Sequence, residues 1–313
     1  GVAVIGRTLE AQGLRVAVVP QADWHGDYRD VKKLAKPRLF FGIAPGCMDS
    51  MVNKYTANRR LRSEDAYSPV GRHDCRPEYP TIVYSKILRS LFPDVSIVLG
   101  GIEASLRRLT HYDYWKDELQ KSILCSSGAD MIIYGMGEKP VTALCNELLA
   151  GKQINEIRDI PQTVYLCRKD EIPQGTPAGD ITLHPHEECL RDKKAQAENF
   201  RHIEEESNKM HACRLIQGVD GRYVVVNPPY PPMTTEEVDR CYDLPYTRLP
   251  HPKYKDKRIP AYEMIKHSVN IHRGCFGGCA FCTISAHQGK FIASRSKESI
   301  INDKNAWLDN FCP

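Results

Sequence analysis

The sequence lacks the long hydrophobic runs that membrane spans require. None of its 313 residues lies in a stretch approaching the roughly 18 consecutive apolar residues that cross a bilayer. Its first residues also lack the charged start, apolar core and small-residue cleavage site of a secretory signal. We therefore expect a soluble, cytoplasmic protein with no membrane partner.

Cysteine is plentiful, but it lacks the spacing of a disulfide framework. Nine of the 12 cysteines are scattered along the chain, at Cys47, Cys75, Cys125, Cys145, Cys167, Cys189, Cys213, Cys241 and Cys312. A secreted disulfide scaffold would be a short chain with a high density of cysteine. The scattered cysteines therefore favour an intracellular protein.

The chain also lacks a strong excess of charge of either sign. It has 43 Lys and Arg against 39 Asp and Glu, a net charge of +4, which does not by itself imply a nucleic-acid partner. The densest basic run, NRRLR at residues 58–62, lies among acidic residues in a polar segment. A solvated loop is the default interpretation, and the binding of RNA or another anion is the less favoured one.

The three remaining cysteines form the most informative motif of the sequence. In RGCFGGCAFC, residues 273–282, Cys275, Cys279 and Cys282 follow the pattern C-x3-C-x2-C. Such spacings let the sulfurs of a short loop converge on one centre, and the three glycines of the loop give the backbone freedom beside a bulky core. A four-iron cluster normally takes four thiolates. Three thiols therefore leave one iron for a ligand that is not protein.

The loop resembles the signature of the radical S-adenosylmethionine (SAM) superfamily. Phe281, the aromatic residue before the third cysteine, completes the likeness. The resemblance implies that Cys275, Cys279 and Cys282 hold a [4Fe–4S] cluster, that SAM chelates the fourth iron, and that Phe281 lies near the SAM adenine. It also implies reductive cleavage of SAM to a 5′-deoxyadenosyl radical, with an electron from a reductant such as flavodoxin or ferredoxin.

A narrower resemblance covers nearly the whole chain. The segments NPPYPPMTTEEVDRCYDLPYTRLPHPKY (227–254), IPAYEMIKHSV (259–269) and CFGGCAFCTISAHQGKFIASRSKESI (275–300) are similar to the YgiQ family of radical SAM proteins. This resemblance names no substrate. It also assigns no residue to hydrogen abstraction, so the catalytic residues are left unknown.

Two alternatives to a SAM-cleaving enzyme stay open. One is a zinc-stabilised, non-catalytic binding module, in which His287 or His272 completes a closed site of three cysteines and one histidine. Zinc sites usually bring cysteines in two separated pairs, however. The other is a corrinoid-dependent radical SAM enzyme of the methyltransferase type. The axial-histidine motif D-x-H-x-x-G is absent from the sequence, and cobalamin is not the favoured cofactor.

The pattern of apolar runs predicts an α/β protein in three parts. Residues 1–150 alternate β-branched runs with helical segments, which predicts a parallel sheet with helices on both faces. This part is a Rossmann-like domain that resembles the cobalamin-binding domain of radical SAM enzymes. Residues 151–260 are predicted to form a connector region. Residues 261–313 are predicted to begin a (β/α) barrel, with the cysteine loop after its first strand.

The sequence also predicts individual strands, helices and turns within these parts. Strands are expected within residues 14–20, 38–46, 95–101, 129–135, 162–167 and 223–230, and helices within residues 1–13 and 186–214. Histidines of the charged segment 186–214 are expected on a solvated face. The turns LGGIEAS (99–105) and YGMGEKP (134–140) are expected at the carboxyl ends of strands, where doubly wound sheets bind ligands.

The chain is expected to be one part of a longer enzyme. Ser296 is predicted to cap the first barrel helix, with Ile300, Ile301 and Trp307 on its buried face. A barrel needs further strand–helix units, and an open edge strand would be an aggregation hazard. We therefore predict that these 313 residues do not turn over SAM by themselves.

Overall fold

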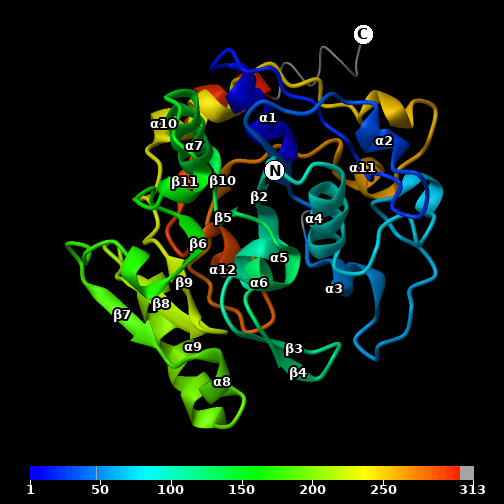
Figure 1. Ribbon diagram of the computed structural model, residues 1–313. Coiled ribbons are helices and arrows are strands. Elements are labelled where there is room, and N and C mark those ends of the chain that lie inside the picture. Colours follow the sequence, from blue (N-terminus) through cyan, green and yellow to red (C-terminus); the bar gives the residue numbers. More distant parts are fainter. Residues whose placement is uncertain (47, 304–313) are drawn as a thin grey trace.

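A mixed seven-stranded sheet forms the centre of the molecule, with strand order β1-β2-β5-β6-β9-β8-β7. The computed structural model describes residues 1–46 and 48–303 (Figure 1). The sheet strands are β1 (Phe40–Ile43), β2 (Ser96–Leu99), β5 (Met131–Ile133), β6 (Thr163–Cys167), β7 (Asp180–Leu183), β8 (Arg214–Val219) and β9 (Arg222–Val226). Two separate two-stranded sheets pair β3 (His111–Asp113) with β4 (Glu118–Gln120), and β10 (His272–Arg273) with β11 (Ala293–Ser294).

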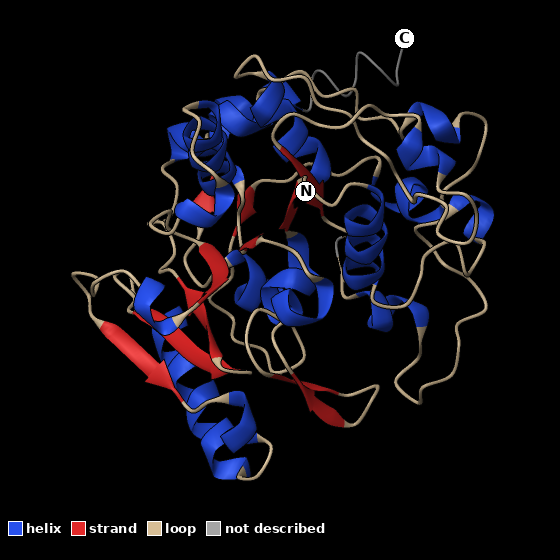
Figure 2. Cartoon of the chain, viewed as in Figure 1, coloured by secondary structure: helices blue, strands red, loops and turns tan. Residues whose placement is uncertain are grey.

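Helices surround this sheet (Figure 2). They are α1 (Val2–Glu10), α2 (Arg29–Lys32), α3 (Ser50–Lys54), α4 (Pro80–Leu91), α5 (Gly101–Leu106), α6 (Ile123–Ser127), α7 (Glu138–Leu149), α8 (His186–Cys189), α9 (Lys193–Ser207), α10 (Thr235–Tyr242), α11 (Pro260–Ile265) and α12 (Ile284–Gln288). A further helical stretch runs from Lys297 to Asp303, the last described residue. Within the described ranges, no helix is both long enough and apolar enough to cross a membrane.

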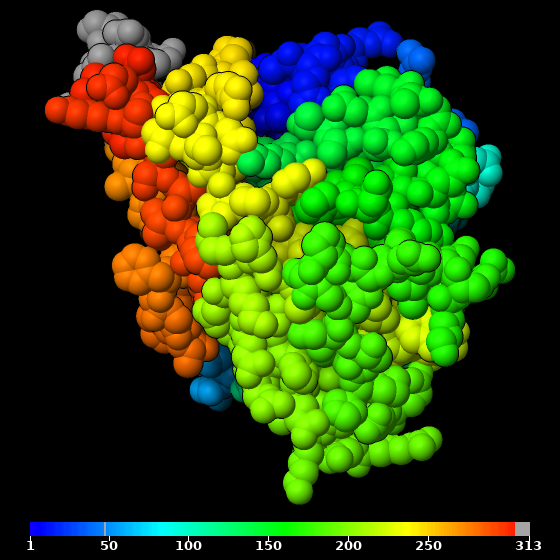
Figure 3. All heavy atoms as spheres, turned by 90° about the vertical axis from the view of Figure 1, so that its left-hand side faces the viewer, coloured from blue at the N-terminus to red at the C-terminus, as the bar shows by residue number. Residues whose placement is uncertain are grey.

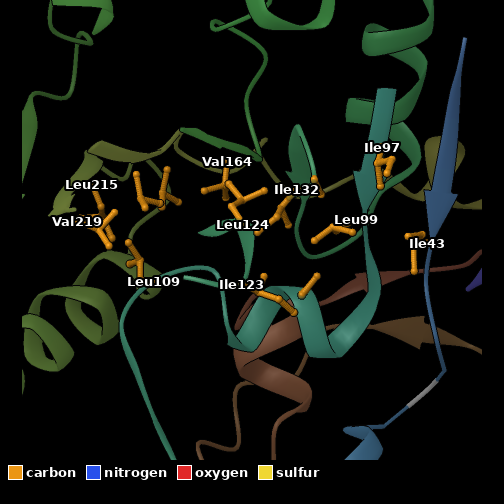
Figure 4. Packing of buried hydrophobic residues seen from close by; sticks show 14 of the residues in the cluster. Ile43, Ile97, Leu99, Leu109, Ile123, Leu124, Ile132, Val164, Leu215 and Val219 are labelled. Carbon is orange, nitrogen blue, oxygen red and sulfur yellow. The ribbon is translucent and has the colours of Figure 1, made fainter. Parts of the chain in front are cut away.

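The first three strands of the sheet are parallel and carry helices on both faces. β2 pairs in parallel with β1 and with β5. Successive strand residues point to opposite faces, so Ile97 and Leu99 join a core with α4 and α6 (Figure 4), whereas Val98 joins a second core with α1 and α7. The predicted parallel sheet with two covered faces is confirmed for these strands.

The sheet continues without interruption past residue 150. β6 pairs antiparallel with β5 and β9, β9 pairs antiparallel with β8, and β7 is parallel to β8. β8 and β9 are joined at Asp220 and Gly221, which both have positive φ, as a tight hairpin with a primed turn requires. The sheet is therefore mixed rather than parallel throughout. The predicted division into residues 1–150, 151–260 and 261–313 stays a prediction.

The strand predicted within residues 14–20 is wrong. This segment follows α1 but adopts no strand conformation. Leu14 and Val16 are partly buried against the core beneath α1. The apolar run thus contributes side chains to the core without pairing its backbone, a difference that hydrophobic periodicity does not reveal.

The single charged helix predicted within residues 186–214 is also wrong. α8 ends at Cys189, and a new helix starts after Asp192, whose side chain accepts a 2.8 Å hydrogen bond from the Lys194 amide. An aspartate in this position favours a fresh helix start. His186, expected on a solvated face, is buried with its Nδ1 3.1 Å from Thr110 Oγ1.

The helix predicted after the cysteine loop begins as expected. Ser296 caps it, since the Ser299 amide donates a 3.1 Å hydrogen bond to Ser296 Oγ. Ile300 is partly buried, but Ile301 is exposed, so its assignment to the buried face is wrong. Trp307 lies outside the described residues.

Candidate functional site

The cysteine loop leaves the end of a short strand, as its sequence predicts. β10 ends at Arg273, and its partner in the described chain is the antiparallel strand β11. Gly274 follows with φ +84°, and a Cβ built there would lie 2.0 Å from the Phe291 carbonyl oxygen. Only glycine has no Cβ and also tolerates this φ. The local backbone therefore depends on Gly274.

Two hydrogen bonds fix the start of the loop against the end of α12. The Gly274 amide donates to Gln288 Oε1 at 3.1 Å, and the Cys275 amide donates to the Gly289 carbonyl oxygen, also at 3.1 Å. The loop and the helix that follows it thus form one local unit. In the space-filling view, the orange segment that contains the loop lies on the surface beside the yellow-green segment with α9 (Figure 3).

All three loop cysteines are free thiols. Cys279 is exposed, and Cys275 and Cys282 are partly buried. The Gly277 amide donates to Cys275 Sγ at 3.4 Å, and a Cβ built on Gly277 would lie 3.3 Å from that sulfur and 3.8 Å from Cys279 Sγ. Two sulfurs therefore flank Gly277. Within residues 1–46 and 48–303, however, no three Cys, His, Asp or Glu side chains lie close enough together to hold a metal ion.

Two aromatic residues of the loop are exposed. Phe281 has 91% of its surface exposed and Phe276 has 81%. Phe281 therefore does not pack beneath the loop, which was the simplest structural use for this residue. Its predicted place near a SAM adenine stays a prediction.

Arg273, the residue before the loop, is held by the first half of the chain. Its Nη1 lies 2.6 Å from Oε1 of Glu138, a buried residue at the start of α7. Its Nε donates to the Tyr242 hydroxyl of α10 at 2.8 Å. A buried, charge-assisted contact of this kind orients its partners strongly. The base of the loop is thus positioned by α7 through Glu138 and by α10 through Tyr242.

Ser105 links three sequence motifs. It is fully buried in α5, and its Oγ accepts a 3.1 Å hydrogen bond from the Gly135 amide. The same Oγ lies 2.9 Å from Nδ1 of His287 in α12. The turns after β2 and β5, predicted at the carboxyl ends of strands, therefore meet each other and the helix that follows the cysteines. α12 lies beside α5 (Figure 1).

His287 is engaged within the protein rather than at the thiols. Burial, followed by the positive charges of Arg273, the N-terminus and Arg108, lowers the pKa of His287 to about 4. The ring is therefore neutral at pH 7, and its Nδ1 lies within hydrogen-bond distance of Ser105 Oγ. His272, the other histidine suggested as a zinc ligand, is exposed in β10.

Several positioning residues were not identified from the sequence. Ser105 and Glu138 lie inside the two turns that were expected at the carboxyl ends of strands, but the local sequence assigns no contact to either side chain. Arg108 follows α5 and lies outside both turns, and no local motif identifies it. A motif shows where a backbone turns, whereas the contacts of its polar side chains depend on which segments are brought together in the fold.

The chain belongs to the radical SAM N-terminal family, because the model of that family, described as Radical SAM N-terminal, matches residues 1–268. Among its relatives is a UPF0313 protein of Bacteroides thetaiotaomicron, 68% identical over 97% of this chain and 50% of the relative. The UPF0313 protein YgiQ of Escherichia coli K12 is 42% identical over 99% of this chain and 49% of the relative. These relatives confirm the resemblance to YgiQ proteins. The chain spans about half the length of the curated relatives it matches.

A solved structure shares the fold. It is the radical SAM methyltransferase TsrM from Kitasatospora setae, bound to tryptophan and a SAM analogue. The TM-score is 0.50 at 14% identity, and the match covers 98% of this chain and 42% of TsrM. At this level of identity the likeness concerns the fold alone.

Proposed function

We propose that this chain is the N-terminal part of a radical SAM enzyme that holds a [4Fe–4S] cluster on Cys275, Cys279 and Cys282. The observation that carries the proposal is the set of three free thiols on one glycine-rich loop. Thiolates are the protein ligands of such clusters. Gly278 has open space around it, so the exposed side of the loop has room for the sulfurs to converge. The donor set therefore fits the cluster.

The residues of this chain would bind and orient. Each thiolate holds one iron, and Arg273, held by Glu138 and Tyr242, fixes the direction in which the loop leaves its strand. Phe281 is exposed and free to cover a SAM adenine. When bound, such a cluster supplies the electron for the reductive cleavage of SAM to a 5′-deoxyadenosyl radical. The substrate is unknown, and a flavodoxin or ferredoxin is the proposed electron donor.

We also propose the division into three parts that the sequence pattern predicts. The parallel strands β1, β2 and β5, with helices on both faces, would be a Rossmann-like domain through residue 150. Residues 151–260 would connect it to the barrel. β10, the cysteine loop and the helix from Lys297 would be the first unit of a (β/α) barrel. The short antiparallel pairing of β10 with β11 is the feature that the remainder of such a barrel would have to replace or extend.

Metal analysis after anaerobic reconstitution with iron and sulfide tests the proposal. About four iron and four sulfide per chain are expected, together with a brown colour. Replacing any one loop cysteine by Ala should abolish this uptake. Cys75→Ala is the matched control, because Cys75 is a free thiol outside the loop. A colourless protein with stoichiometric zinc would instead establish a zinc-stabilised binding module.

A further inference from the structure

A cavity of about 130 Å³ lies between α12 and the prolines of residues 228–232. Its walls come from the turn after β5, the end of α9, the prolines of residues 228–232 and the segment 285–291 that includes α12. Cavities of roughly 150 Å³ bind a molecule the size of benzene. This cavity can therefore take a ring-sized group and is open to solvent on one side. α12 starts two residues after Cys282, so the cavity lies close in sequence to the loop.

The three lysines that line the cavity each form an ion pair with a glutamate. Lys139 lies 2.7 Å from Glu237, Lys290 lies 2.8 Å from Glu204, and Lys209 lies 2.6 Å from Glu206. Each positive charge therefore has an anionic partner within the protein. These lysines do not call for a ligand.

Arg108 lines the same cavity and has no ion pair in the described part of the chain. Its guanidinium lies 4.9 Å from the centre of the Tyr134 ring, and its Nη1 donates to the Ser105 carbonyl oxygen. Its Nε is buried without a hydrogen-bond partner. Burial is the largest cause that lowers the pKa of Arg108, and the negative charges of Tyr134 and Glu204 offset only part of this effect.

Arg108 is half-buried, and a cation that is partly removed from water without an ion pair is poorly compensated. A guanidinium presents a planar fork of donors that matches a carboxylate or a phosphate. The neighbouring Tyr134 ring and the prolines add apolar walls to the same space. The chemistry of the walls thus matches an acid attached to an apolar group.

We propose that this cavity binds a small organic anion, a carboxylate or phosphate ester carrying a group about the size of a benzene ring, with Arg108 as its counter-ion. The inference concerns binding alone and does not require a cluster or SAM. If the proposed enzyme function also holds, the bound anion would lie against the helix that follows the cysteine loop.

Thermal unfolding of the iron-free chain tests this binding with benzoate and phenyl phosphate as probes and benzamide as the uncharged analogue. Saturating benzoate or phenyl phosphate should raise the midpoint by about 2 °C or more, with a dependence on concentration. Benzamide should not. A larger response to one of the two anions would show whether the site prefers a carboxylate or a phosphate.

Arg108→Met removes the counter-ion and should abolish the response to both anions. The ligand-free variant should unfold near the temperature of the unmodified chain, because the loss of a half-buried charge without an ion pair offsets the loss of the hydrogen bond to the Ser105 carbonyl oxygen. Lys139→Met should keep the response, because Lys139 lines the same cavity but is paired with Glu237. Arg214→Met is the contrasting control: this buried arginine is paired with Asp180 at 2.6 Å, so its loss should lower the midpoint but leave the anion response unchanged.

If neither anion raises the midpoint of the unmodified chain, the proposal is wrong. It is also wrong if Arg108→Met responds as strongly as the unmodified chain. Should Arg108→Met fail to fold, Arg108→Lys retains the charge but loses the planar fork, and a weaker response is then expected. None of these results depends on iron content, so the outcome is separate from that of the cluster proposal.

Discussion

At the scale of single residues, Gly274 does most to define the candidate site. Its positive φ and the 2.0 Å distance from a built Cβ to the Phe291 carbonyl oxygen leave no room for another residue. Gly278, in the same loop, also has a positive φ, but its surroundings are open. The two glycines therefore separate the cost of backbone strain from the cost of a steric clash.

We predict that Gly274→Ala frees the start of the loop from α12. The Cβ would force Phe291 away and break the bonds of the Gly274 and Cys275 amides, so hydrogen exchange at these amides should accelerate roughly tenfold or more. Iron uptake should fall as well. Gly278→Ala carries only the strain of its φ, about 1 kcal/mol, and should exchange almost normally. Equal exchange in the two variants would contradict the prediction.

At the scale of elements, α12 is the piece that joins the cysteine loop to the first half of the chain. Gln288 and Gly289 fix the loop, and His287 reaches Ser105 in α5. Arg273 adds an ion pair to α7. The loop therefore has a defined position although Cys279 and both aromatic rings are exposed.

We predict that acid weakens the docking of α12. Burial and the nearby positive charges together hold the folded-state pKa of His287 at about 4, below the ordinary value of about 6.5. The unfolded state thus binds the proton first, and stability falls as pH decreases from about 6.5 to 4, by roughly 2–3 kcal/mol for this group. Urea unfolding of His287→Asn should lack this contribution.

The exposed His272 supplies the comparison for this measurement. His272→Asn should retain the pH dependence of the unmodified chain. A stability difference between the unmodified chain and His287→Asn that stays constant from pH 7 to pH 4 would show that His287 does not control the docking.

At the scale of the whole molecule, the sheet and the cysteine loop are energetically separate. The two main cores consist of side chains from the sheet and from the helices that precede α10, and no loop cysteine belongs to them. Hydrophobic burial is the dominant favourable contribution to folding. The sheet should therefore fold whether or not the loop binds a cluster.

We predict that the triple variant Cys275→Ala, Cys279→Ala and Cys282→Ala keeps its fold. Its free energy of unfolding without metal should change by about 0.5 kcal/mol or less, as for other substitutions outside the core, while iron uptake is lost. Cys145→Ser is the contrast, because Cys145 is buried between α7 and the sheet, and a hydroxyl there should cost about 1–3 kcal/mol. Denaturant unfolding followed by circular dichroism measures both. A large loss of stability in the triple variant would show that the loop supports the sheet.

Strands and turns with strong local signals could be predicted from the sequence. β2 and β5 are short apolar runs closed by glycine. The segment 14–20 has an equally apolar pattern but no strand partner, so its prediction was wrong. Residues 186–214 break at Asp192 because a local cap outweighs the continuous charged pattern.

The sequence by itself determined the cysteine spacing, the need for glycine beside it and the alternation that builds two covered faces of a sheet. These properties depend on neighbours along the chain. The tertiary structure alone decided that β6 to β9 extend the same sheet, that Ser105 joins Gly135 to His287, and that Arg108 lines a cavity without an ion pair to any described residue. Such contacts join residues far apart in the sequence, and packing rather than local pattern selects them.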